Sequence, residues 1–319
     1  MLSSLSHLRN QVFLIFMTIH LAAAMSTSTT TSTTKAKKPL ILFCHGSGDT
    51  GYGAQSWIES LLPKSVYEQY DWLYPSAKPI PYTLNGGMVT SVWYDRDAHG
   101  FHPKYPEQTQ TVEESTQLLL DIIHTEIEDK GRTPNSILLG GFSMGGAIAY
   151  QTGIRYHYNL WKESLQQIQQ EKEGQEGNEK CQSNTYNYED KRLGGIFGLS
   201  CYLNYDSKVW SLLDEMTTKQ SKDSSMSTLS SSSVSFPPMY MAHGTIDDFI
   251  LPTWGQTTYE TFQEKLHDLH AAYTHEDEHG DNSTTDSNMK ILLELLPNLH
   301  HEMNTYELVQ VLNYFSSVQ

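Results

Sequence analysis

The segment "GFSMG" at 141–145 places one serine between glycines, just after the apolar run Ile137–Leu139. A strand, a sharp turn and a helix in this order are the context of a nucleophile elbow. The turn is so tight that side chains at the flanking positions would collide, so Gly141 and Gly145 suit it. It would expose the Ser143 hydroxyl above a sheet, at the positive end of a helix. A plain helix N-cap is the alternative for such a serine, and the context favours a nucleophile for acyl transfer.

A serine nucleophile needs a histidine base and an acid that orients the base. In proteins with a nucleophile elbow these partners follow the serine in the order acid, then histidine. Downstream, Asp247 and Asp248 follow the apolar run "MYMAHG", and His300 and His301 follow "ILLELLPNL". Both pairs fall in loops after predicted strands, at the sheet edge where active sites of open α/β folds form. The order and the places predict a Ser–His–Asp arrangement, while each pair leaves two candidates open.

An acyl-transfer site also needs donors for the negative charge that develops on the carbonyl oxygen. One expected donor is the backbone N–H of Met144, directly after the serine. The second is expected from "HGSGDTG" after the first strand, where the backbone N–H of Ser47 is the candidate. The side chains of such donors matter little, whereas Gly46 and Gly48 let this backbone approach a substrate.

Predicted strands and helices alternate from Pro39 onward. Apolar runs such as "PLILFCHG", "NSILLGGFS", "LGGIFGLSCYL" and "PPMYMAHG" have the length of buried strands, and residues 111–131 have apolar side chains at helical spacing. Strands that are apolar throughout are typical of parallel sheets covered on both faces. The expected fold class is therefore α/β, with a mostly parallel central sheet flanked by helices.

Residues 1–24 have the features of a secretory signal peptide, with Arg9 ahead of the apolar run "VFLIFMTIHLAAA". The run is too short for a membrane-spanning helix. We therefore expect entry into the secretory pathway, with initiation at Met25 and a cytoplasmic protein as the alternative. The Ser/Thr-rich residues 25–38 have the composition of a disordered linker, so the folded domain is expected over 39–319.

Three polar, low-complexity stretches interrupt the alternation and are expected to be surface insertions. They cover 162–192, 217–235 and 274–288. The last contains acidic residues and histidines between His275 and Asp281, which raises the question of a metal site. Nothing fixes these side chains on a rigid element, so a solvated charge run is the simpler interpretation and no metal is expected.

The composition excludes several classes of protein. Among 319 residues there are 21 Lys and Arg against 37 Asp and Glu, a formal net charge of −16, which argues against nucleic-acid binding. Three cysteines without a CxxC pair support neither a disulfide framework nor a structural zinc site. The chain has no phosphate-binding loop or cofactor motif, so no cofactor is expected and the side chains above must carry the reaction.

Six segments together resemble the acyl-protein thioesterase and carboxylesterase family of α/β-hydrolases, whose members are also called lysophospholipases. They are "LFCHGSGDTGYGAQSW", "YPSAKPIPYTLNGGMVTSVWYD", "SILLGGFSMGGAIAY", "GLSCYL", "AHGTIDD" and "LPNLHHEM", and the resemblance runs from Pro39 to Phe315 outside the insertions. It implies the α/β-hydrolase fold, with Ser143 as nucleophile, Asp247 as acid and His301 as base.

The chain departs from this family pattern in a few places. Met144 stands where the family usually has glutamine, and Ser47 where leucine is frequent, but only their backbone is implicated. The family is mainly cytosolic and lacks signal peptides, so the N-terminal segment is a further departure. The insertions are another, and they could alter substrate access.

The resemblance also implies substrates, because the family acts on palmitoylated proteins, lysophospholipids and simple esters. S-acylated proteins or lipid esters are therefore the implied partners, with peripheral contact to a membrane surface. In the family the segment "PIPYTLNGGMVTSVWYD" lies beside the active site, and its apolar residues Leu84, Met88 and Trp93 are candidates for an acyl groove, with core packing as the alternative. The leading function is depalmitoylation by thioester hydrolysis. The alternatives are a carboxylesterase or lysophospholipase acting on oxyesters, and a catalytically inactive binding protein.

Overall fold

A six-stranded parallel sheet forms the centre of the fold. The computed structural model describes residues 37–175, 188–222, 236–273 and 290–318, and all elements named below lie in these ranges. Across the sheet the strands are β2 (Asp71–Leu73), β1 (Leu40–Cys44), β5 (Ile137–Phe142), β6 (Gly195–Leu199), β7 (Met239–Gly244) and β8 (Ile291–Leu296), and each pairing is parallel. β1, β5, β6 and β7 are buried along their whole length. The expected α/β class with a mostly parallel sheet is thus confirmed.

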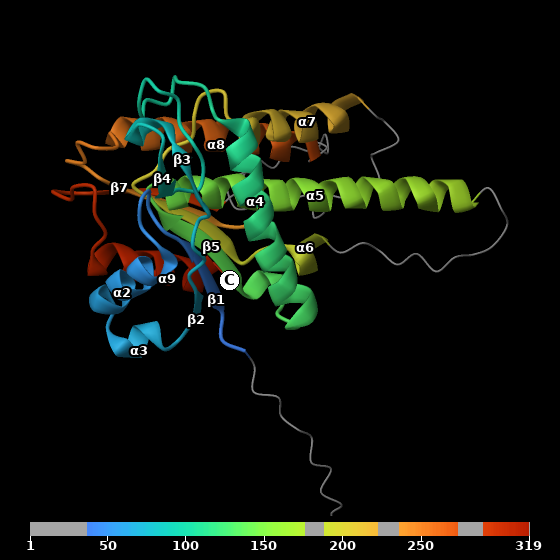
Figure 1. The fold of residues 1–319 in the computed structure, drawn as a ribbon. Coiled ribbons are helices and arrows are strands. Elements are labelled where there is room, and N and C mark those ends of the chain that lie inside the picture. The colour runs from blue at the N-terminus through green and yellow to red at the C-terminus, as the bar shows by residue number, and fades with distance from the viewer. Residues whose placement is uncertain (1–36, 176–187, 223–235, 274–289, 319) are drawn as a thin grey trace, which may run out of the picture. The chain divides into compact units, whose positions relative to one another are not determined.

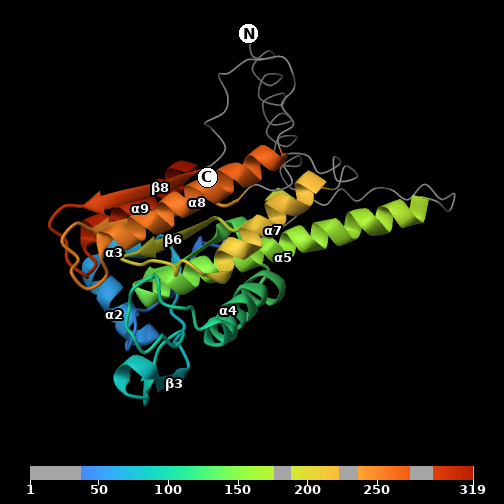
Figure 2. The same cartoon turned by 90° about the horizontal axis from the view of Figure 1, so that it is seen from above.

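Helices cover both faces of this sheet (Figures 1 and 2). One face carries α4 (Thr109–His124), α5 (Met144–Gln175), α7 (Lys208–Lys222) and α8 (Pro252–Tyr273), and the other carries α2 (Gly51–Leu61), α3 (Lys64–Tyr67) and α9 (Thr305–Val318). A one-turn helix, α6 (Tyr188–Lys191), precedes β6. Successive side chains of a strand point to opposite faces, so Leu42 joins the core under α4, α5, α7 and α8, while Ile41 and Phe43 join the core under α2 and α9. This two-sided burial explains why the strands are apolar throughout rather than alternating.

A separate antiparallel hairpin follows β2. It consists of β3 (Pro79–Tyr82), a single 3-10 turn, η1 (Thr83–Asn85), and β4 (Met88–Ser91). Met88 and Val89 are exposed at 60% and 70%, whereas Trp93, just after β4, is buried. The apolar residues of this segment are therefore divided between an exposed strand and the core.

Helices extend further than the sequence pattern predicts. α5 continues to Gln175, so the first part of the expected insertion 162–192 is helical. Its Glu, Gln and Lys residues are good helix formers, and Leu165 still packs against the core. α7 likewise reaches Lys222, inside the expected insertion 217–235. α2 is not predicted by the pattern, since glycines stand in its first turn.

Several predicted segments lie outside the described residues. These are the expected signal segment and most of the expected linker, the remainder of two insertions, and the acidic stretch, which fall within 1–36, 176–187, 223–235 and 274–289. The corresponding predictions stay predictions. In the described ranges, no helix combines the length and the apolar character that a membrane span requires.

A histidine on α5 is buried in the core. His157 is fully buried, and its ring centroid lies 5.4 Å from that of Phe236. Burial first, and the positive charge of Arg192 second, lower the pKa of this imidazole to about 3. In an unfolded chain the pKa of the same side chain is about 6.5. The folded protein therefore keeps His157 neutral at pH values where the unfolded chain protonates it.

We expect acid to destabilise the protein through His157. Below pH 6.5 the unfolded chain binds a proton that the folded imidazole, with its lowered pKa, does not accept, so stability is present above the unfolded pKa and is lost as the pH falls. Between pH 7 and pH 5 the free energy of unfolding should drop by about 2 kcal/mol from this group, measured by urea unfolding. The drop should shrink in His157→Asn and persist in His267→Asn, at an exposed histidine on α8. Equal drops in both variants would contradict the prediction.

Candidate active site

A strained serine links β5 to α5. Ser143 has a φ of +54°, a conformation that costs a non-glycine residue free energy and persists only where the surroundings enforce it. Its N–H donates to the carbonyl of Leu199 at the end of β6 (2.8 Å). A Cβ on Gly145 would lie 2.0 Å from the carbonyl oxygen of Cys44, and one on Gly141 would lie 2.4 Å from the same oxygen. The two glycines thus let the elbow pack directly against the end of β1.

A continuous series of hydrogen bonds joins Ser143, His301 and Asp247. The Nε2 atom of His301 lies 2.9 Å from the serine Oγ, and the Nδ1 atom lies 2.7 Å from Oδ2 of Asp247. The neighbouring candidates Asp248 and His300 are both exposed and take no part in this series. Loops after β5, β7 and β8 therefore bring together the three residues that the family resemblance implies.

The carboxyl group of Asp247 is held in its ionised form. Burial by itself raises its pKa, but hydrogen bonds from His243, His301 and the N–H of Ile250 lower the pKa well below its ordinary value. Oδ1 accepts from the N–H groups of Phe249 (3.0 Å) and Ile250 (2.9 Å). An ionised carboxylate only accepts hydrogen bonds, so Nδ1 of His301 carries the proton. Its Nε2 is left as the acceptor for the serine hydroxyl.

Backbone hydrogen bonds between the loops after β7 and β8 hold the acid and the base together. The N–H of Thr245 donates to the carbonyl of Leu296 (2.9 Å), and the N–H of Ile246 donates to the carbonyl of Leu299 (3.2 Å). A Cβ on Gly244 would lie 2.1 Å from the same Leu299 oxygen, so this close approach requires glycine. The spacing between the two side chains is thus set by main-chain contacts.

A second histidine contacts Asp247, and the motif spacing does not predict it. The Nε2 atom of the buried His243 lies 2.7 Å from the carbonyl oxygen of Ile250 and 3.3 Å from Oδ2 of Asp247. Both neighbours are acceptors, so this nitrogen carries the proton. The available signal in the sequence is the position of His243 at the end of β7, directly before the loop that carries the aspartate.

The loop after β1 lies beside the elbow. A Cβ on Gly46 would lie 3.7 Å from the Cβ of the elbow serine. The carbonyl of His45 accepts from the indole N–H of Trp93 (2.8 Å). The N–H of Gly48, whose φ is +80°, donates to the carbonyl of Ser91 at the end of β4 (2.9 Å). The hairpin segment therefore fixes the position of this loop.

The His45 side chain orders the same loop from inside the protein. Its Nε2 accepts from the N–H of Ala77 (2.9 Å), so the ring proton resides on Nδ1, which donates to the carbonyl of Gly46 (2.7 Å). Burial lowers the pKa of His45, against smaller raising effects of the Gly46 carbonyl and Asp49. The neutral ring is the form that satisfies both hydrogen bonds.

Two backbone donors beside the serine have no protein acceptor. Within the described part of the chain, neither the N–H of Ser47 nor the N–H of Met144 donates a hydrogen bond to protein. Met144 is the first residue of α5, where intrahelical acceptors are lacking and the helix dipole is positive. Ser47 lines the same cavity as Ser143. Both predicted donors are therefore free to meet a ligand.

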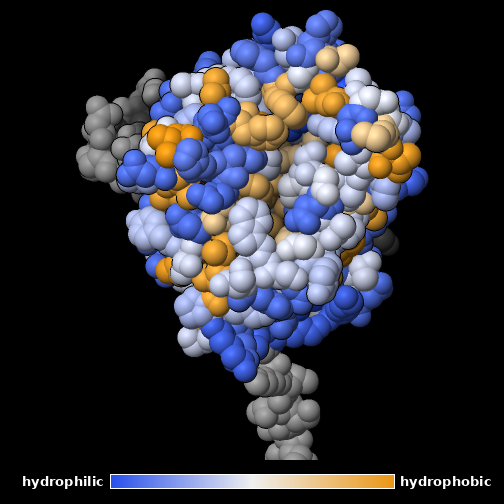
Figure 3. Space-filling view, turned by 60° about the vertical axis from the view of Figure 1, so that its left-hand side comes forward, coloured by the Kyte–Doolittle hydropathy of each residue, from blue (hydrophilic) through white to orange (hydrophobic). Residues whose placement is uncertain are grey.

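A cavity of about 310 Å³ opens beside Ser143. Figure 3 shows this side of the molecule, where apolar and weakly polar surface surrounds a hollow between hydrophilic margins. The elements β1, α2, β5 and the loop before α9 contribute an apolar part, made of Phe43, Ala54, Trp57, Phe142 and Met303. The rest of the lining comes from the loop after β1, from β3, from the segment after β4 and from the loop after β7, with Ser47, Asp49, Tyr82, Arg96, Phe101 and Phe249.

The three acyl-groove candidates lie outside the lining of this cavity, so the predicted groove is not found at these residues. Trp93 is buried in the core, Leu84 packs against the core, and Met88 is 60% exposed on β4. The chain turns inward after β4, which directs the indole of Trp93 to the carbonyl of His45 instead of to the cavity. Tyr82 is the residue at the end of β3 that lines the cavity.

The two described cysteines are buried, and the described residues contain no cluster of metal ligands. Cys44 and Cys201 are free and buried, and burial raises the pKa of both thiols. Among the residues that the structure describes, no three His, Cys, Asp or Glu side chains gather as metal ligands do.

Comparison with known proteins supports the assignment of the fold. The crystal structure of Arabidopsis thaliana SOBER1 superposes with a TM-score of 0.58, at 21% identity, over 88% of this chain and 98% of that chain. The crystal structure of Zea mays acyl-protein thioesterase 2 superposes with a TM-score of 0.57, at 20% identity, over 89% of this chain and 95% of that chain. At these identities the likeness concerns the fold.

Sequence comparison shows similarity to one family of hydrolases. The family model described as phospholipase/carboxylesterase matches residues 25–161. Lysophospholipase-like protein 1 of Mus musculus is 26% identical over 269 residues, 84% of this chain and 82% of that protein. Acyl-protein thioesterase 1 of Emericella nidulans is 27% identical over 228 residues, 70% of this chain and 75% of that protein.

The fold and the hydrogen-bonded serine define the class as an α/β-hydrolase. Within that class, residues 25–161 match the phospholipase/carboxylesterase family model, and the chain is similar to proteins named lysophospholipase-like protein 1 and acyl-protein thioesterase 1.

The contact between the elbow and β1 generates a test of stability. We expect Gly145→Ala to lower the free energy of unfolding by about 3 kcal/mol, because its Cβ would lie 2.0 Å from a backbone oxygen that cannot move independently. Gly46→Ala is the matched control, since its nearest neighbour is the Phe142 ring at 3.3 Å, and should cost under about 1 kcal/mol. Urea unfolding midpoints measure both. Similar losses in the two variants would show that the approach to β1 is not the constraint.

Proposed function

We propose that this protein is a serine hydrolase that cleaves acyl thioesters of S-acylated proteins. The observation that carries the proposal is the series from Ser143 through His301 to the ionised Asp247, at the wall of a cavity with an apolar part. Relatives named acyl-protein thioesterase support the same reaction class.

The geometry suits a two-step acyl transfer. His301 Nε2 accepts the proton of the Ser143 hydroxyl as its oxygen attacks the acyl carbonyl carbon, and the ionised Asp247 stabilises the imidazolium that forms. The backbone N–H groups of Ser47 and Met144 stabilise the oxyanion. The imidazolium then gives its proton to the departing sulfur, which leaves an acyl-serine. Water, deprotonated by the same imidazole, releases the acid and restores the serine.

A thioester suits this site because its carbonyl is less stabilised by resonance than that of an oxyester and because a thiolate leaves more easily than an alkoxide. The apolar part of the cavity, with Trp57, Phe142 and Met303, is where we place the acyl chain. Hydrolysis of oxyesters is the second candidate, favoured by the family's description and by the relative named lysophospholipase-like protein 1.

Replacing members of the hydrogen-bonded series should abolish turnover. We expect Ser143→Ala, His301→Ala and Asp247→Asn each to lower kcat/KM by roughly three to four orders of magnitude or more. Ser143→Ala should also lose labelling by a fluorophosphonate probe, which separates a live hydrolase from an inactive binding protein. The adjacent variants His300→Ala and Asp248→Asn should stay within a few-fold of wild type, because both side chains are exposed. A dead His300→Ala with an active His301→Ala would contradict the assignment.

The substrate class is tested with a series of thioesters and their matched oxyesters of increasing chain length. We expect kcat/KM to rise with acyl length on thioesters, by up to about fourfold per buried methylene, which corresponds to roughly 0.8 kcal/mol. Trp57→Ala should flatten the profile, whereas Met88→Ala, exposed on β4 and outside the cavity, should not. A flat wild-type profile with short oxyesters preferred would favour the carboxylesterase alternative.

A further inference from the structure

A cation lies in the wall of the substrate cavity without an acidic partner. Arg96 lines the cavity together with Ser143 and His301. Its NH1 atom donates to the hydroxyl of Tyr202 (2.7 Å), and its buried Nε atom has no hydrogen-bond partner. Among the described residues no carboxylate forms an ion pair with it, and the side chains packed around it are aromatic. A partly buried cation without a counter-charge costs free energy, and an anionic ligand offsets that cost.

Aromatic rings cover the guanidinium. The Cζ atom of Arg96 lies 5.6 Å, 5.1 Å and 5.5 Å from the ring centroids of Tyr94, Phe101 and Tyr202. Such contacts stabilise the cation without using its N–H groups. The N–H groups of the two terminal nitrogens that do not face Tyr202 therefore stay available for an oxyanion, which a guanidinium recognises with parallel hydrogen bonds.

A second polar group in the same wall also has no partner. Tyr82 is only 6% exposed, lines the cavity, and its hydroxyl makes no hydrogen bond of normal geometry in the described part of the chain. Burial raises its pKa, and the charge of Arg96 lowers it to a smaller extent, as does the nearby Ser47 hydroxyl. A neutral phenol beside an arginine offers one more donor to an anion.

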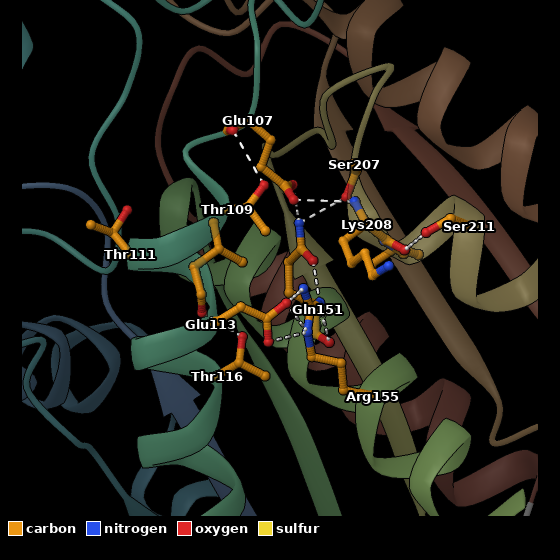
Figure 4. Close-up of polar contacts among 12 residues, drawn as sticks. Glu107, Thr109, Thr111, Glu113, Thr116, Gln151, Arg155, Ser207, Lys208 and Ser211 are labelled. Atoms are coloured by element: carbon orange, nitrogen blue, oxygen red, sulfur yellow. Dashed lines mark hydrogen bonds and ion pairs between the residues drawn. The ribbon is translucent and has the colours of Figure 1, made fainter. Parts of the chain in front are cut away.

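The loop that carries Arg96 is anchored at its far end (Figure 4). Glu107 accepts from the side-chain amide of Gln151 and from the N–H of Lys208 (3.1 Å). The same Gln151 amide donates to Ser207 (2.8 Å), and its oxygen accepts from Arg155. These bonds tie the loop to α5 and to the start of α7. The far end of the loop is therefore fixed, while the guanidinium itself is held by the Tyr202 hydroxyl and the aromatic rings.

The cavity also holds one carboxylate, Asp49. A Cβ on Gly53 would lie 1.9 Å from its Oδ1, so this carboxylate faces the first turn of α2. Negative groups are favoured at the start of a helix. Asp49 is thus directed to α2, and Arg96 remains the cation that a substrate meets.

We propose that Arg96, assisted by Tyr82, binds a negatively charged group of the substrate. The preferred thioesters then carry an anion, either at the far end of the acyl chain or on the leaving thiol. The inference rests on the proposed hydrolase function, because it takes the cavity beside Ser143 as the substrate site.

Two pairs of thioesters test the proposal and distinguish the two locations of the anion. The first pair shares one thiol and has an octanedioyl chain that ends in a carboxylate or in a carboxamide. The second pair has an octanoyl chain on 3-mercaptopropionate or on 3-mercaptopropanamide. For each pair, the ratio of kcat/KM for the anionic member to that for the neutral member is measured. Losses that affect both members equally, including partial misfolding, cancel in this ratio.

We expect the wild-type ratio to exceed one in one of the pairs and to fall about ten- to a hundred-fold in Arg96→Gln. Arg96→Lys should give an intermediate ratio, because the charge remains while the planar fork is lost. Lys104→Gln is the matched control, since it removes an exposed positive charge from the same loop outside the cavity lining, and its ratio should match wild type.

Arg96→Gln ratios within twofold of wild type in both pairs would overturn the proposal, as would an equal fall in Lys104→Gln. Failure of the underlying function has a different signature. In that case the wild-type protein would hydrolyse none of the four thioesters and would not react with the fluorophosphonate probe.

Discussion

The ionised carboxylate of Asp247 is the group on which the geometry of the candidate site depends. It lies almost fully buried at the end of the sheet and is stabilised by donors from two directions. Phe249 and Ile250 donate their N–H groups to one oxygen, and His301 and His243 approach the other. A buried charge is tolerated only when hydrogen bonds replace its hydration. The same bonds fix the tautomer of His301, which turns its free nitrogen toward Ser143.

The parallel sheet makes this arrangement possible because its strands all end at one edge. β5 ends at the serine, β7 leads to the aspartate, and β8 leads to the histidine. The loop after β1 completes the site, but it is positioned from outside the sheet, by hydrogen bonds from Trp93 and to Ser91 beside the hairpin. The three hydrogen-bonded residues thus lie at the strand ends, while the loop after β1 and part of the cavity wall depend on the segment between β2 and α4.

The residues proposed for the reaction and the residues proposed for substrate specificity therefore lie in different parts of the site. In the proposed reaction the serine, histidine and aspartate transfer the acyl group, and they do not determine which acyl group is chosen. In the proposed hydrolase that choice falls to side chains of the cavity wall that carry no reactive group: Trp57 and Met303 on the apolar part, and Arg96 and Tyr82 on the polar part. An arginine without an acidic partner in this wall costs free energy, and the charged substrate that we propose would offset that cost.

The sequence by itself determined the class of fold and the places where reactive residues lie. The alternation of apolar strands with helices and the tight turn that the glycines around Ser143 indicate are both local features. Each can therefore be recognised in a short stretch of sequence. The residues alone did not decide between Asp247 and Asp248, or between His300 and His301, and the family resemblance implied Asp247 and His301. In the structure these two side chains contact each other, whereas Asp248 and His300 are exposed. Three contacts were decided only by the tertiary structure. His243 contacts Asp247, Trp93 binds the loop after β1 instead of lining a groove, and Arg96 lies in the cavity wall. These are contacts between segments far apart in the chain, and no local pattern encodes them, because they arise from how the loops pack once the sheet has formed.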